Sequence, residues 1–485
     1  MEFLSAFQVI YVIIVAIVCL RVIYDTNHIT KTLSYLLVVI FIPVFGIIFY
    51  FSFGVNYRNS KIYSKKLFSN IQFERKLELQ LQHYAKQIIK NRGSLLESNK
   101  KLIRLLFNDI SSPLTNKNEV DLLINGETKF PEVYKAIEAA KHHIHLEYYV
   151  FTEDIVGKKI ETLLIQKAKE GVQVKFMYDD YGSSSIRKSM VYRLRAAGIE
   201  AYPFYKIKLI YLANRMNYRN HRKIIVIDGR VGFVGGINVS DTYTNDIKTK
   251  PFPFWRDTHL KIHGPAVWYL QYLFLCDWNF CAKCDIEPKD EFFPNLDSFE
   301  TTSNVAVQIA ASGPDSKTPT ILYSLLQAIS LAEEEILITT PYFVPNESIM
   351  DALCIAAMSG VKVKLLVPRT SDSKVVNAAA SSYYEELMKS GVQIYRYTKG
   401  FIHAKTMAVD DEIAIVGSAN MDMRSFDLNF EVNAIIYDKD VNKKLKDAFN
   451  TDLNDASEIN LERWLARSWY HELLEKLARL LSPLL

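Results

Sequence analysis

Two short stretches of the sequence carry the same reactive side chains at the same spacing. Each follows the pattern His-x-Lys-x4-Asp, and the two copies are His221, Lys223 and Asp228, and His403, Lys405 and Asp410. The chain holds only 10 histidines, so two such matches at corresponding places are not expected by chance. A small-residue pair, an asparagine and a further carboxylate follow each copy; these residues are Gly236, Asn238 and Asp257, and Ser418, Asn420 and Glu431.

The duplicated set has the composition of a phosphate pocket. Side chains alternate along a strand, so an imidazole and an ammonium two residues apart point the same way. Lysine and asparagine donate hydrogen bonds to anions, and a glycine pair lets the backbone come close to a bound phosphate. We therefore expect Asn238, Asn420, Gly236 and Ser418 to bind the substrate.

Two imidazoles that face each other across such a pocket could divide the work of a displacement at phosphorus. One would attack phosphorus, and the other would protonate the leaving oxygen. The two lysines would stabilise the pentacoordinate transition state, a role that metal ions fill elsewhere. The sequence therefore predicts catalysis without a metal ion or any other cofactor.

The carboxylates near these motifs are of two kinds. Asp228 and Asp410 belong to the catalytic motif, but they fall on the opposite strand parity from the lysines, and we expect them to act as structural partners. Asp257 and Glu431 are better candidates to orient the imidazoles.

The surrounding sequence repeats as well, which places the two motifs in equivalent settings. Matched segments around Ile137 and Ile329, Gly171 and Gly360, and Gly198 and Gly391 are offset by 192, 189 and 193 residues. Within each copy, amphipathic helical segments alternate with β-branched runs, which predicts an α/β sandwich. Such duplicated domains, here 113–300 and 301–485, would pack face to face about a pseudo-two-fold axis that carries the site.

The N-terminal region has a different composition. Phe3 to Leu20 and Leu33 to Phe53 are apolar and each is long enough to cross a membrane, which predicts a two-helix transmembrane hairpin within 1–57. A cleaved signal peptide is the alternative for the first run, but that run lacks a basic start. Lysines and arginines follow the second run, so the catalytic domains should be cytoplasmic. Residues 58–112 have the pattern of an amphipathic connector, which could pack on the domains or lie along the lipid surface.

Composition limits the partners. The 485 residues carry 58 basic and 54 acidic side chains, and a net charge of +4 gives no reason to expect nucleic acid as a partner. Five cysteines are an odd number, typical of a reducing compartment. Cys281 with Cys284 and the trio His142, His143 and His145 could be imagined as metal sites, but each lacks the remaining ligands.

Three further features have two readings each. Trp255 and Tyr342 could line the access of lipid to the site or could be core aromatics. The basic and apolar segment 206–216 suits a headgroup interface or a plain surface loop. A C-terminal amphipathic helix from Trp464 to Leu480 could lie on a membrane or pack on the second domain.

The paired motifs resemble those of the phospholipase D superfamily, and the chain around them resembles its bacterial cardiolipin synthase branch along nearly its whole length. The segments that carry the resemblance are the two apolar runs, Asn217 to Lys223, Trp255 to His259, Ser312 to Asp315, Thr340 to Pro345, Gly417 to Ser425, Asn429 to Glu431 and Leu481 to Leu485. The resemblance implies a multi-pass protein of the bacterial inner membrane that acts on membrane lipid.

The implied reaction moves a phosphatidyl group from one phosphatidylglycerol to the hydroxyl of another and releases glycerol, through a phosphohistidine and without metal. Family habit favours His221 as the nucleophile, although the duplicated residues alone leave the choice between His221 and His403 open. The alternatives are a membrane phospholipase or nuclease that gives the intermediate to water, and a catalytically silent membrane-associated binding protein. Donor headgroup, acyl selectivity and oligomeric state, a homo-oligomer included, stay open.

Overall fold

The structure is a computed structural model of the full chain, and it describes residues 2–25, 29–51, 94–204, 218–246, 254–284, 286, 290–299 and 301–482. The predicted headgroup segment 206–216 and the first part of the predicted connector lie outside the described residues.

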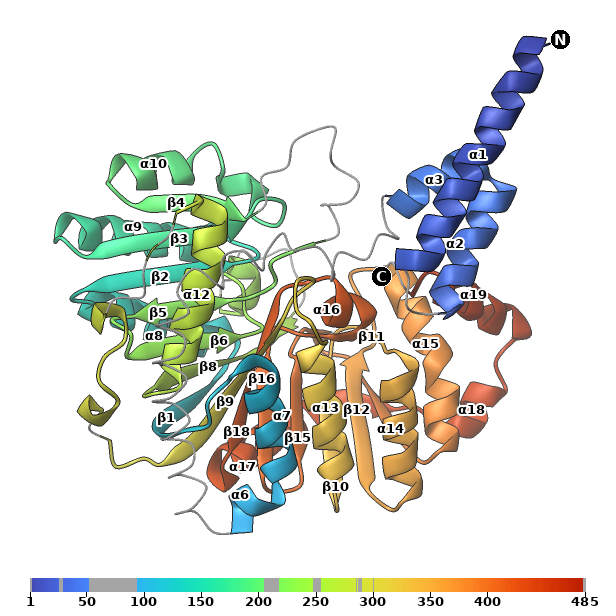
Figure 1. Ribbon diagram of the computed structural model, residues 1–485. Coiled ribbons are helices and arrows are strands. Elements are labelled where there is room, and N and C mark those ends of the chain that lie inside the picture. The colour runs from blue at the N-terminus through green and yellow to red at the C-terminus, as the bar shows by residue number, and fades with distance from the viewer. Residues whose placement is uncertain are drawn as a thin grey trace.

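One long mixed sheet organises the soluble part of the protein (Figure 1). Its order is β19-β13-β12-β10-β15-β16-β18-β9-β1-β8-β6-β5-β2-β3-β4. The strands of the first half are β1 (Thr115–Ile124), β2 (His143–Tyr148), β3 (Gln173–Asp179), β4 (Glu200–Phe204), β5 (Ile224–Ile227), β6 (Val231–Gly235) and β8 (Thr258–His263). Those of the second half are β9 (Val305–Ser312), β10 (Glu335–Thr339), β12 (Lys362–Pro368), β13 (Gln393–Tyr397), β15 (Thr406–Val409), β16 (Ile413–Gly417), β18 (Glu431–Tyr437) and the edge strand β19 (Ala456–Glu458).

The strand order is the same when it is followed outward from the centre in either direction. The strand order β1-β8-β6-β5-β2-β3-β4 of the first half corresponds to the order β9-β18-β16-β15-β10-β12-β13 of the second. The pair β2 with β3 and the pair β10 with β12 occupy corresponding places, and both pairs are parallel. The equivalent strands β1 and β9 pair antiparallel at the centre, where Thr115 lies opposite Val307. A pseudo-two-fold axis therefore passes through the middle of the sheet, as the sequence repeat predicts.

The two halves share a core near this axis. Side chains of β5, β6 and β8 from one half cluster with those of β15, β16 and β18 from the other, and buried examples are Val226, Val234, Ala408, Val416 and Ala434. The strands of this shared core are rich in apolar residues; β5, for example, reads Ile-Ile-Val-Ile and is buried along its length. Burial of apolar surface from both halves favours their association.

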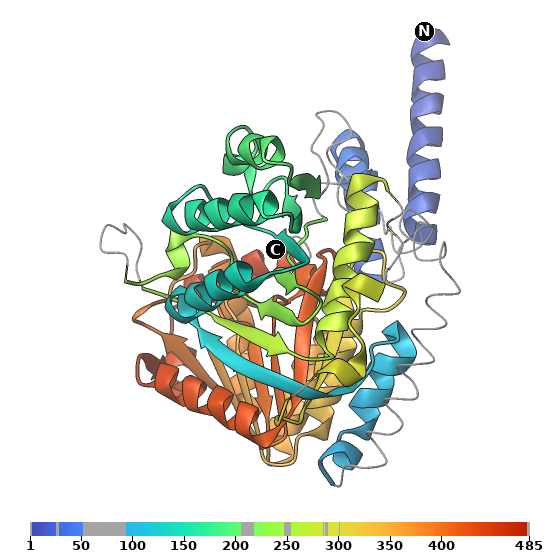
Figure 2. The same ribbon diagram turned by 90° about the vertical axis from the view of Figure 1, so that its left-hand side faces the viewer.

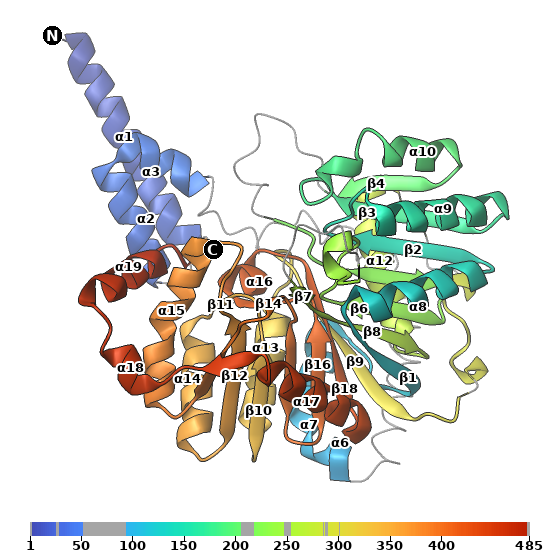
Figure 3. The same cartoon turned by 180° about the vertical axis from the view of Figure 1, so that it is seen from behind.

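Helices cover the faces of the sheet. The first half carries α8 (Asn125–Ala139), α9 (Ile155–Lys169), α10 (Met190–Ala196) and α12 (Val267–Ala282). The second half carries α13 (Thr320–Leu331), α14 (Glu347–Met358), α15 (Lys374–Lys389), α16 (Met423–Asp427), α17 (Lys439–Leu453), α18 (Leu461–Leu465) and α19 (Trp469–Arg479). In Figure 1 α12 lies in front of the first half, whereas α17 lies in front of the second half when the molecule is seen from behind (Figure 3).

Two small parallel sheets lie outside the main one, near the site. The strand β7 (Phe254–Arg256) of the first half pairs with β14 (Gly400–Ile402) of the second. The strand β11 (Phe343–Val344) pairs with β17 (Met421–Asp422) within the second half. The β7 and β14 pair is thus a direct backbone link between the two halves.

The N-terminal region forms three apolar helices, α1 (Glu2–Asp25), α2 (Ile29–Phe41) and α3 (Pro43–Phe49). The first projects beyond the sheet (Figure 2). In the described part of the chain only α1 contains a stretch, Gln8–Asp25, that is long and apolar enough to cross a membrane. The second run, predicted as one span over Leu33 to Phe53, is divided at Ile42 between α2 and α3 in the described residues, and a second membrane crossing stays a prediction.

The second apolar run is broken because Pro43 has no backbone N–H to donate within the helix. Close packing follows the break: a side chain at Gly46 would have its Cβ only 2.4 Å from the carbonyl oxygen of Val38. The helices nevertheless pack on one another around Val18, Val22 and Val39. A helical hairpin is present, with one full-length apolar helix.

The end of the predicted connector packs on the second half. Helices α6 (Ser94–Ser98) and α7 (Lys100–Ile110) follow the undescribed segment, and α7 contacts α13. Its apolar face, Leu102, Ile103 and Leu106, joins the core of the second half. Between the two alternatives for this part of the connector, the structure favours packing on the protein.

The C-terminal helix α19 has two different faces. It contacts α15, where the Arg479 guanidinium lies 4.4 Å from the centre of the Tyr383 ring. Its other face leaves Trp469 72% exposed and Leu473 and Leu477 about half exposed. The helix is therefore attached to the second half and still presents an apolar surface.

Candidate active site

The backbone of each half holds the histidine of the other half in place. The N–H of His221, just before β5, donates to the carbonyl oxygen of Phe430 at 2.9 Å. The N–H of His403, just after β14, donates to the carbonyl oxygen of Arg256 at 2.7 Å. The motifs, 182 residues apart in sequence, are thereby brought to the pseudo-two-fold axis.

The two carboxylates cross between the halves as well. Asp257 Oδ2 of the first half lies 2.7 Å from His403 Nδ1 of the second. Glu431 Oε1 of the second half lies 3.1 Å from His221 Nδ1 of the first. Both carboxylates are fully buried, and each accepts the Nδ1–H of its imidazole, which leaves Nε2 free for chemistry.

The motif lysines complete a buried group of cations. Lys223 Nζ donates to the carbonyl oxygen of His221 at 2.6 Å, and Lys405 Nζ donates to that of His403. Burial lowers the pKa of Lys223 to about 8, against the attraction of Glu431 and Asp257. Burial lowers the pKa of Lys405 to about 7, and the charge of Lys223 adds to this effect. An anion between the two ammonium groups would relieve their repulsion.

Burial also acts on the imidazoles. It lowers the pKa of His403 to about 4, assisted by the charge of Lys405 and opposed by Asp257. The pKa of His221 is lowered for the same first reason, and Glu431 opposes the shift. Burial would raise the pKa of Glu431, but the attraction of His221 and Lys223 outweighs it, so this pKa is lowered. The free site thus holds neutral imidazoles, with an ionised Glu431 beside His221.

Asp228 and Asp410, grouped with the catalytic motif from the sequence, lie at the far end of their strands from the histidines. The Asp228 carboxylate accepts the backbone N–H groups of Lys141, His142 and His143 at 2.8 to 2.9 Å. The Asp410 carboxylate makes the equivalent bonds to residues 333–335. Both carboxylates anchor the start of a neighbouring strand, and neither forms a hydrogen bond with the imidazole of His221 or His403; these contacts fit the structural role expected from strand parity and not a catalytic one.

Gly236 and Ser418, expected to bind substrate, instead support the carboxylates. A Cβ at Gly236 would lie 2.2 Å from Asp257 Oδ1, so only glycine leaves room for that carboxylate. Ser418 Oγ donates to Glu431 Oε2 at 2.5 Å. The glycine in the first copy thus leaves space for an aspartate, and the serine in the second copy donates a hydrogen bond to a glutamate.

Asn238 and Asn420 are bound mainly to protein groups. Asn238 Nδ2 donates to the hydroxyl of Tyr243 at 2.7 Å, and its Oδ1 accepts the N–H of Val150. Asn420 Nδ2 donates to Asp422 Oδ2 at 2.9 Å. Asn420 Oδ1 is buried and has no hydrogen-bond partner among the described residues. The side chain of Asn420 therefore has an unused acceptor, whereas both polar atoms of the Asn238 amide are bonded.

The surroundings of the two histidines differ, which the motifs alone did not indicate. His221 lies against the ring of Tyr149, with centroids 4.1 Å apart, and Asn429 Nδ2 lies 3.2 Å from its Nδ1. The rings of Trp255, Tyr243, Tyr342 and Phe401 surround His403 at 5.7 to 6.5 Å. Trp255 and Tyr342, left open from the sequence, therefore belong to the site. The sequence held one sign of this difference: the residue two positions before the carboxylate is Trp255 in the first copy and Asn429 in the second.

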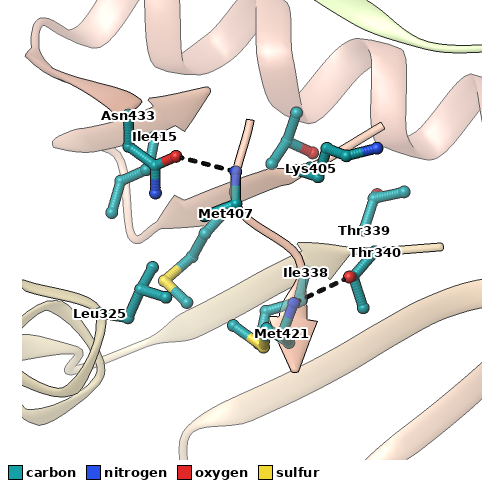
Figure 4. A pocket seen from close by; sticks show the side chains of 11 residues that line it. Leu325, Ile338, Thr339, Thr340, Lys405, Met407, Ile415, Met421 and Asn433 are labelled. Atoms are coloured by element: carbon teal, nitrogen blue, oxygen red, sulfur yellow. Dashed lines mark hydrogen bonds between the residues drawn. The ribbon is translucent and has the colours of Figure 1, made fainter. Parts of the chain in front are cut away.

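A small cavity next to Lys405 lies on the core side of the second motif (Figure 4). Its volume is about 20 Å³, enough for one water molecule. Apolar side chains such as Leu325, Met407 and Ile415 make up much of its lining. It is too small for a lipid headgroup and is not the substrate site.

The imagined metal sites are not assembled. His143 and His145 are buried, and both contact the side-chain amide of Gln271. Cys284 Sγ lies 3.7 Å from Asn279 Oδ1. Within the described ranges, His, Cys, Asp and Glu side chains form no group of three or more that could hold a metal ion.

Comparison with known proteins identifies the family of both halves. The family described as cardiolipin synthase, PLD-like domain, matches residues 133–247 and 325–453, one segment in each half of the sheet. The family described as phospholipase D-nuclease N-terminal matches residues 10–54. The crystal structure of phosphatidylserine synthase from Haemophilus influenzae shares the fold, with a TM-score of 0.58 and 14% identity over 79% of this chain and 98% of that one.

Curated relatives match over nearly the full length. A cardiolipin synthase of Halalkalibacterium halodurans is 42% identical over 99% of this chain and 94% of its own. A cardiolipin synthase of a Geobacillus species is 44% identical over 94% of this chain and 89% of its own. The major cardiolipin synthase of Bacillus subtilis is 41% identical over 99% of this chain and 98% of its own. With a duplicated phospholipase D-like fold and two histidines paired across its axis, this chain belongs to the cardiolipin synthase family of the phospholipase D superfamily.

Proposed function

We propose that this protein is a membrane phosphatidyltransferase that joins two phosphatidylglycerol molecules into cardiolipin and releases glycerol. The observation that carries the proposal is the crossed pairing of His221 with Glu431 and of His403 with Asp257 around two buried lysines. This arrangement offers two Nε2 atoms to one phosphodiester and positive charge to its transition state. Full-length similarity to cardiolipin synthases supports the choice of substrate.

In the first step His221 acts as the nucleophile. Its Nε2 forms a bond to phosphorus while the bond from phosphorus to the headgroup glycerol oxygen breaks. Protonated His403 gives its Nε2 proton to that oxygen, and glycerol leaves. A bound phosphodiester anion opposes the charge of the lysines and so favours the protonated form of His403, whose pKa is about 4 in the free site.

In the second step His403 is the base. It takes the proton of the free glycerol hydroxyl of a second phosphatidylglycerol, whose oxygen forms the new bond to phosphorus. The bond between phosphorus and His221 breaks, cardiolipin forms, and the proton is back on His403. No metal ion, oxidant or other cofactor is needed for this balance.

The membrane arrangement is part of the proposal. Helix α1 crosses the membrane, and the N-terminal helical hairpin with α2 and α3 holds the site at the bilayer surface. The basic residues that follow the second apolar run support a cytoplasmic position of the two catalytic halves at a bacterial inner membrane. Substrate then reaches the site by lateral diffusion.

One experiment separates this proposal from hydrolysis. The purified full-length protein is incubated with labelled phosphatidylglycerol alone, and the lipid products are resolved. We expect cardiolipin and glycerol in equal amounts. Phosphatidic acid as the main product would show that water is the acceptor and would favour a phospholipase.

A further inference from the structure

Arg219 lies two residues before His221 in sequence, and Arg424 belongs to the other half of the protein. In the part of the chain that the structure describes, the guanidinium groups of Arg219 and Arg424 form no hydrogen bond or ion pair with a carboxylate. Arg219 is only 4% exposed, and its guanidinium lies 4.7 Å from the centre of the Tyr181 ring. Burial of a cation without a hydrogen-bonded anion is costly, which indicates that a ligand completes the site.

Both arginines are attached to the segment that holds the histidine. The carbonyl oxygen of Arg219 accepts the N–H of Phe430, and that of Arg424 accepts the N–H of Asn429, each at 2.9 Å. The side chain of Asn429 in turn contacts His221. The arginines therefore come from opposite halves of the protein, and their backbones are anchored to the neighbouring residues Phe430 and Asn429.

Their charges act on the same ring. Burial raises the pKa of Tyr149 to about 12, and both Arg219 and Arg424 oppose this rise, as expected of cations near the tyrosine. Tyr149 packs directly on His221. The charge of Arg424 is also among the causes, after burial, that lower the pKa of His221. Both cations thus lie within electrostatic reach of the reacting group.

The nearest candidate for a protein counter-ion is already occupied. The buried carboxylate of Asp179 lies in the field of Arg219, but its oxygens accept the backbone N–H groups of Tyr181, Gly182 and Asn220. In the proposed mechanism the motif lysines bind the phosphate that reacts. Arg219 and Arg424 therefore supply positive charge in addition to the charge that the lysines provide for one phosphodiester.

Cardiolipin synthesis differs from hydrolysis in needing a second anion. The acceptor phosphatidylglycerol carries its own phosphate only a three-carbon glycerol away from the hydroxyl that attacks. Water and neutral alcohols bring no such group. Arginine suits this task because its planar guanidinium donates two parallel hydrogen bonds to phosphate oxygens.

From this arrangement, and resting on the proposed function, we infer that Arg219 and Arg424 form a subsite for the phosphate of the acceptor lipid. The subsite selects an anionic lipid over water or a neutral alcohol as the acceptor. It leaves the first half of the reaction, the attack on the donor phosphate, to the histidines and lysines.

The test compares two acceptors within one sample. Full-length enzyme in phosphatidylglycerol mixed micelles is supplied with deuterated glycerol, and cardiolipin formation and exchange of deuterated glycerol into phosphatidylglycerol are measured together. Both products come from the same donor step, so their ratio reports only on the acceptor. We expect Arg424→Gln to lower the ratio of cardiolipin to exchange at least about 10-fold, and Arg424→Lys to lower it less.

The ratio is independent of how much of a variant folds, which keeps the test decisive. Arg219→Gln should act in the same direction, and Arg463→Gln, at an exposed position remote from the motifs, should leave the ratio unchanged. An unchanged ratio in Arg424→Gln and Arg219→Gln would overturn the subsite. Failure of the unmodified enzyme to form cardiolipin would instead overturn the proposed function.

Discussion

Asp257 of the first repeat contacts His403 of the second, with 2.7 Å between Oδ2 and Nδ1. Its counterpart, Glu431 with His221, runs in the opposite direction across the axis. Neither half of the protein therefore contains a complete histidine and carboxylate pair. Duplication here does not supply two sites; it supplies one site whose parts are exchanged.

The crossed pairing predicts which variants behave alike. Asp257→Asn should lower kcat at least about 100-fold, because an amide cannot hold His403 in the required tautomer or stabilise its protonated form. With His403 as the acid, this variant should still accumulate a phosphatidyl adduct from a substrate with a good leaving group, just as His403→Ala should. Mass spectrometry of the trapped protein checks this.

Glu431→Gln is the matched comparison, because it removes the partner of the nucleophile. It should resemble His221→Ala and give little adduct. If Asp257→Asn instead resembled His221→Ala, the pairing would follow the sequence repeat rather than the crossed contacts. An adduct found on His403 would exchange the two roles.

A second prediction concerns the residue that makes room for Asp257. Gly236→Ala places a methyl group 2.2 Å from the present position of Asp257 Oδ1, so the carboxylate must move away from His403. We expect activity to fall at least about 10-fold in protein that is still folded. The comparison is Ser418→Ala, which removes the hydrogen bond to Glu431 and the acceptor of the Val432 N–H but introduces no clash, and it should have the smaller effect. Equal activity of Gly236→Ala and the unmodified enzyme would contradict the steric role.

The sequence predicted the duplicated α/β fold because strand and helix periodicity and the constant offset of the repeats are local signals. It also separated Asp228 from the lysines, since parity along a strand places them on opposite faces. It could not predict the crossing of Asp257 and Glu431, which depends on how two halves meet in space. The same limit explains Gly236: a glycine before a carboxylate looks like a phosphate-binding residue until the carboxylate is seen to fill the space.

Differences between the repeats were visible but had no evident meaning in the sequence. Trp255 and Asn429 occupy equivalent places, and only the packing shows that one faces His403 and the other His221. The break at Pro43 was likewise visible, although a proline is tolerated in membrane helices and does not by itself decide whether a span continues. Position in the fold, rather than residue type, distinguished the surroundings of the two histidines.

The third prediction separates structure from chemistry within the motif. Asp228→Ala removes the acceptor of three backbone hydrogen bonds at the start of β2. At roughly 1 kcal/mol for each bond, the protein should lose about 2 to 4 kcal/mol of stability. Thermal unfolding in detergent should show the loss, and activity per folded molecule should change little. Asp410→Ala is the symmetry-related check, and complete inactivity of folded Asp228→Ala would contradict the structural role.

The lysines predict a pH dependence of substrate binding. The pKa of Lys405 is lowered to about 7 and that of Lys223 to about 8, so both are charged below these values and lose their protons as the pH rises. A phosphodiester stays anionic over the whole range. We therefore expect KM to rise as the pH passes from about 7 to 8 and beyond, because the neutral amines bind the anion less well. A KM that stays constant up to pH 9 would contradict this assignment of charge.

The last prediction concerns why such a site should make a lipid rather than destroy one. Water at about 55 M can open a phosphohistidine, so transfer to a glycerol hydroxyl requires that water be sparse and that the acceptor be held close. Because the bond broken and the bond formed are both phosphodiesters, the transfer is nearly thermoneutral, and excess glycerol should drive the full-length enzyme from cardiolipin back to phosphatidylglycerol. Deleting residues 1–56 should leave a folded protein whose cardiolipin output on vesicles falls, since α1 no longer keeps it at the bilayer. Soluble glycerol does not depend on that helix, so reversal in detergent micelles should survive the deletion. Loss of reversal in both forms, with phosphatidic acid as the product, would show that water enters freely and that the site is a hydrolase.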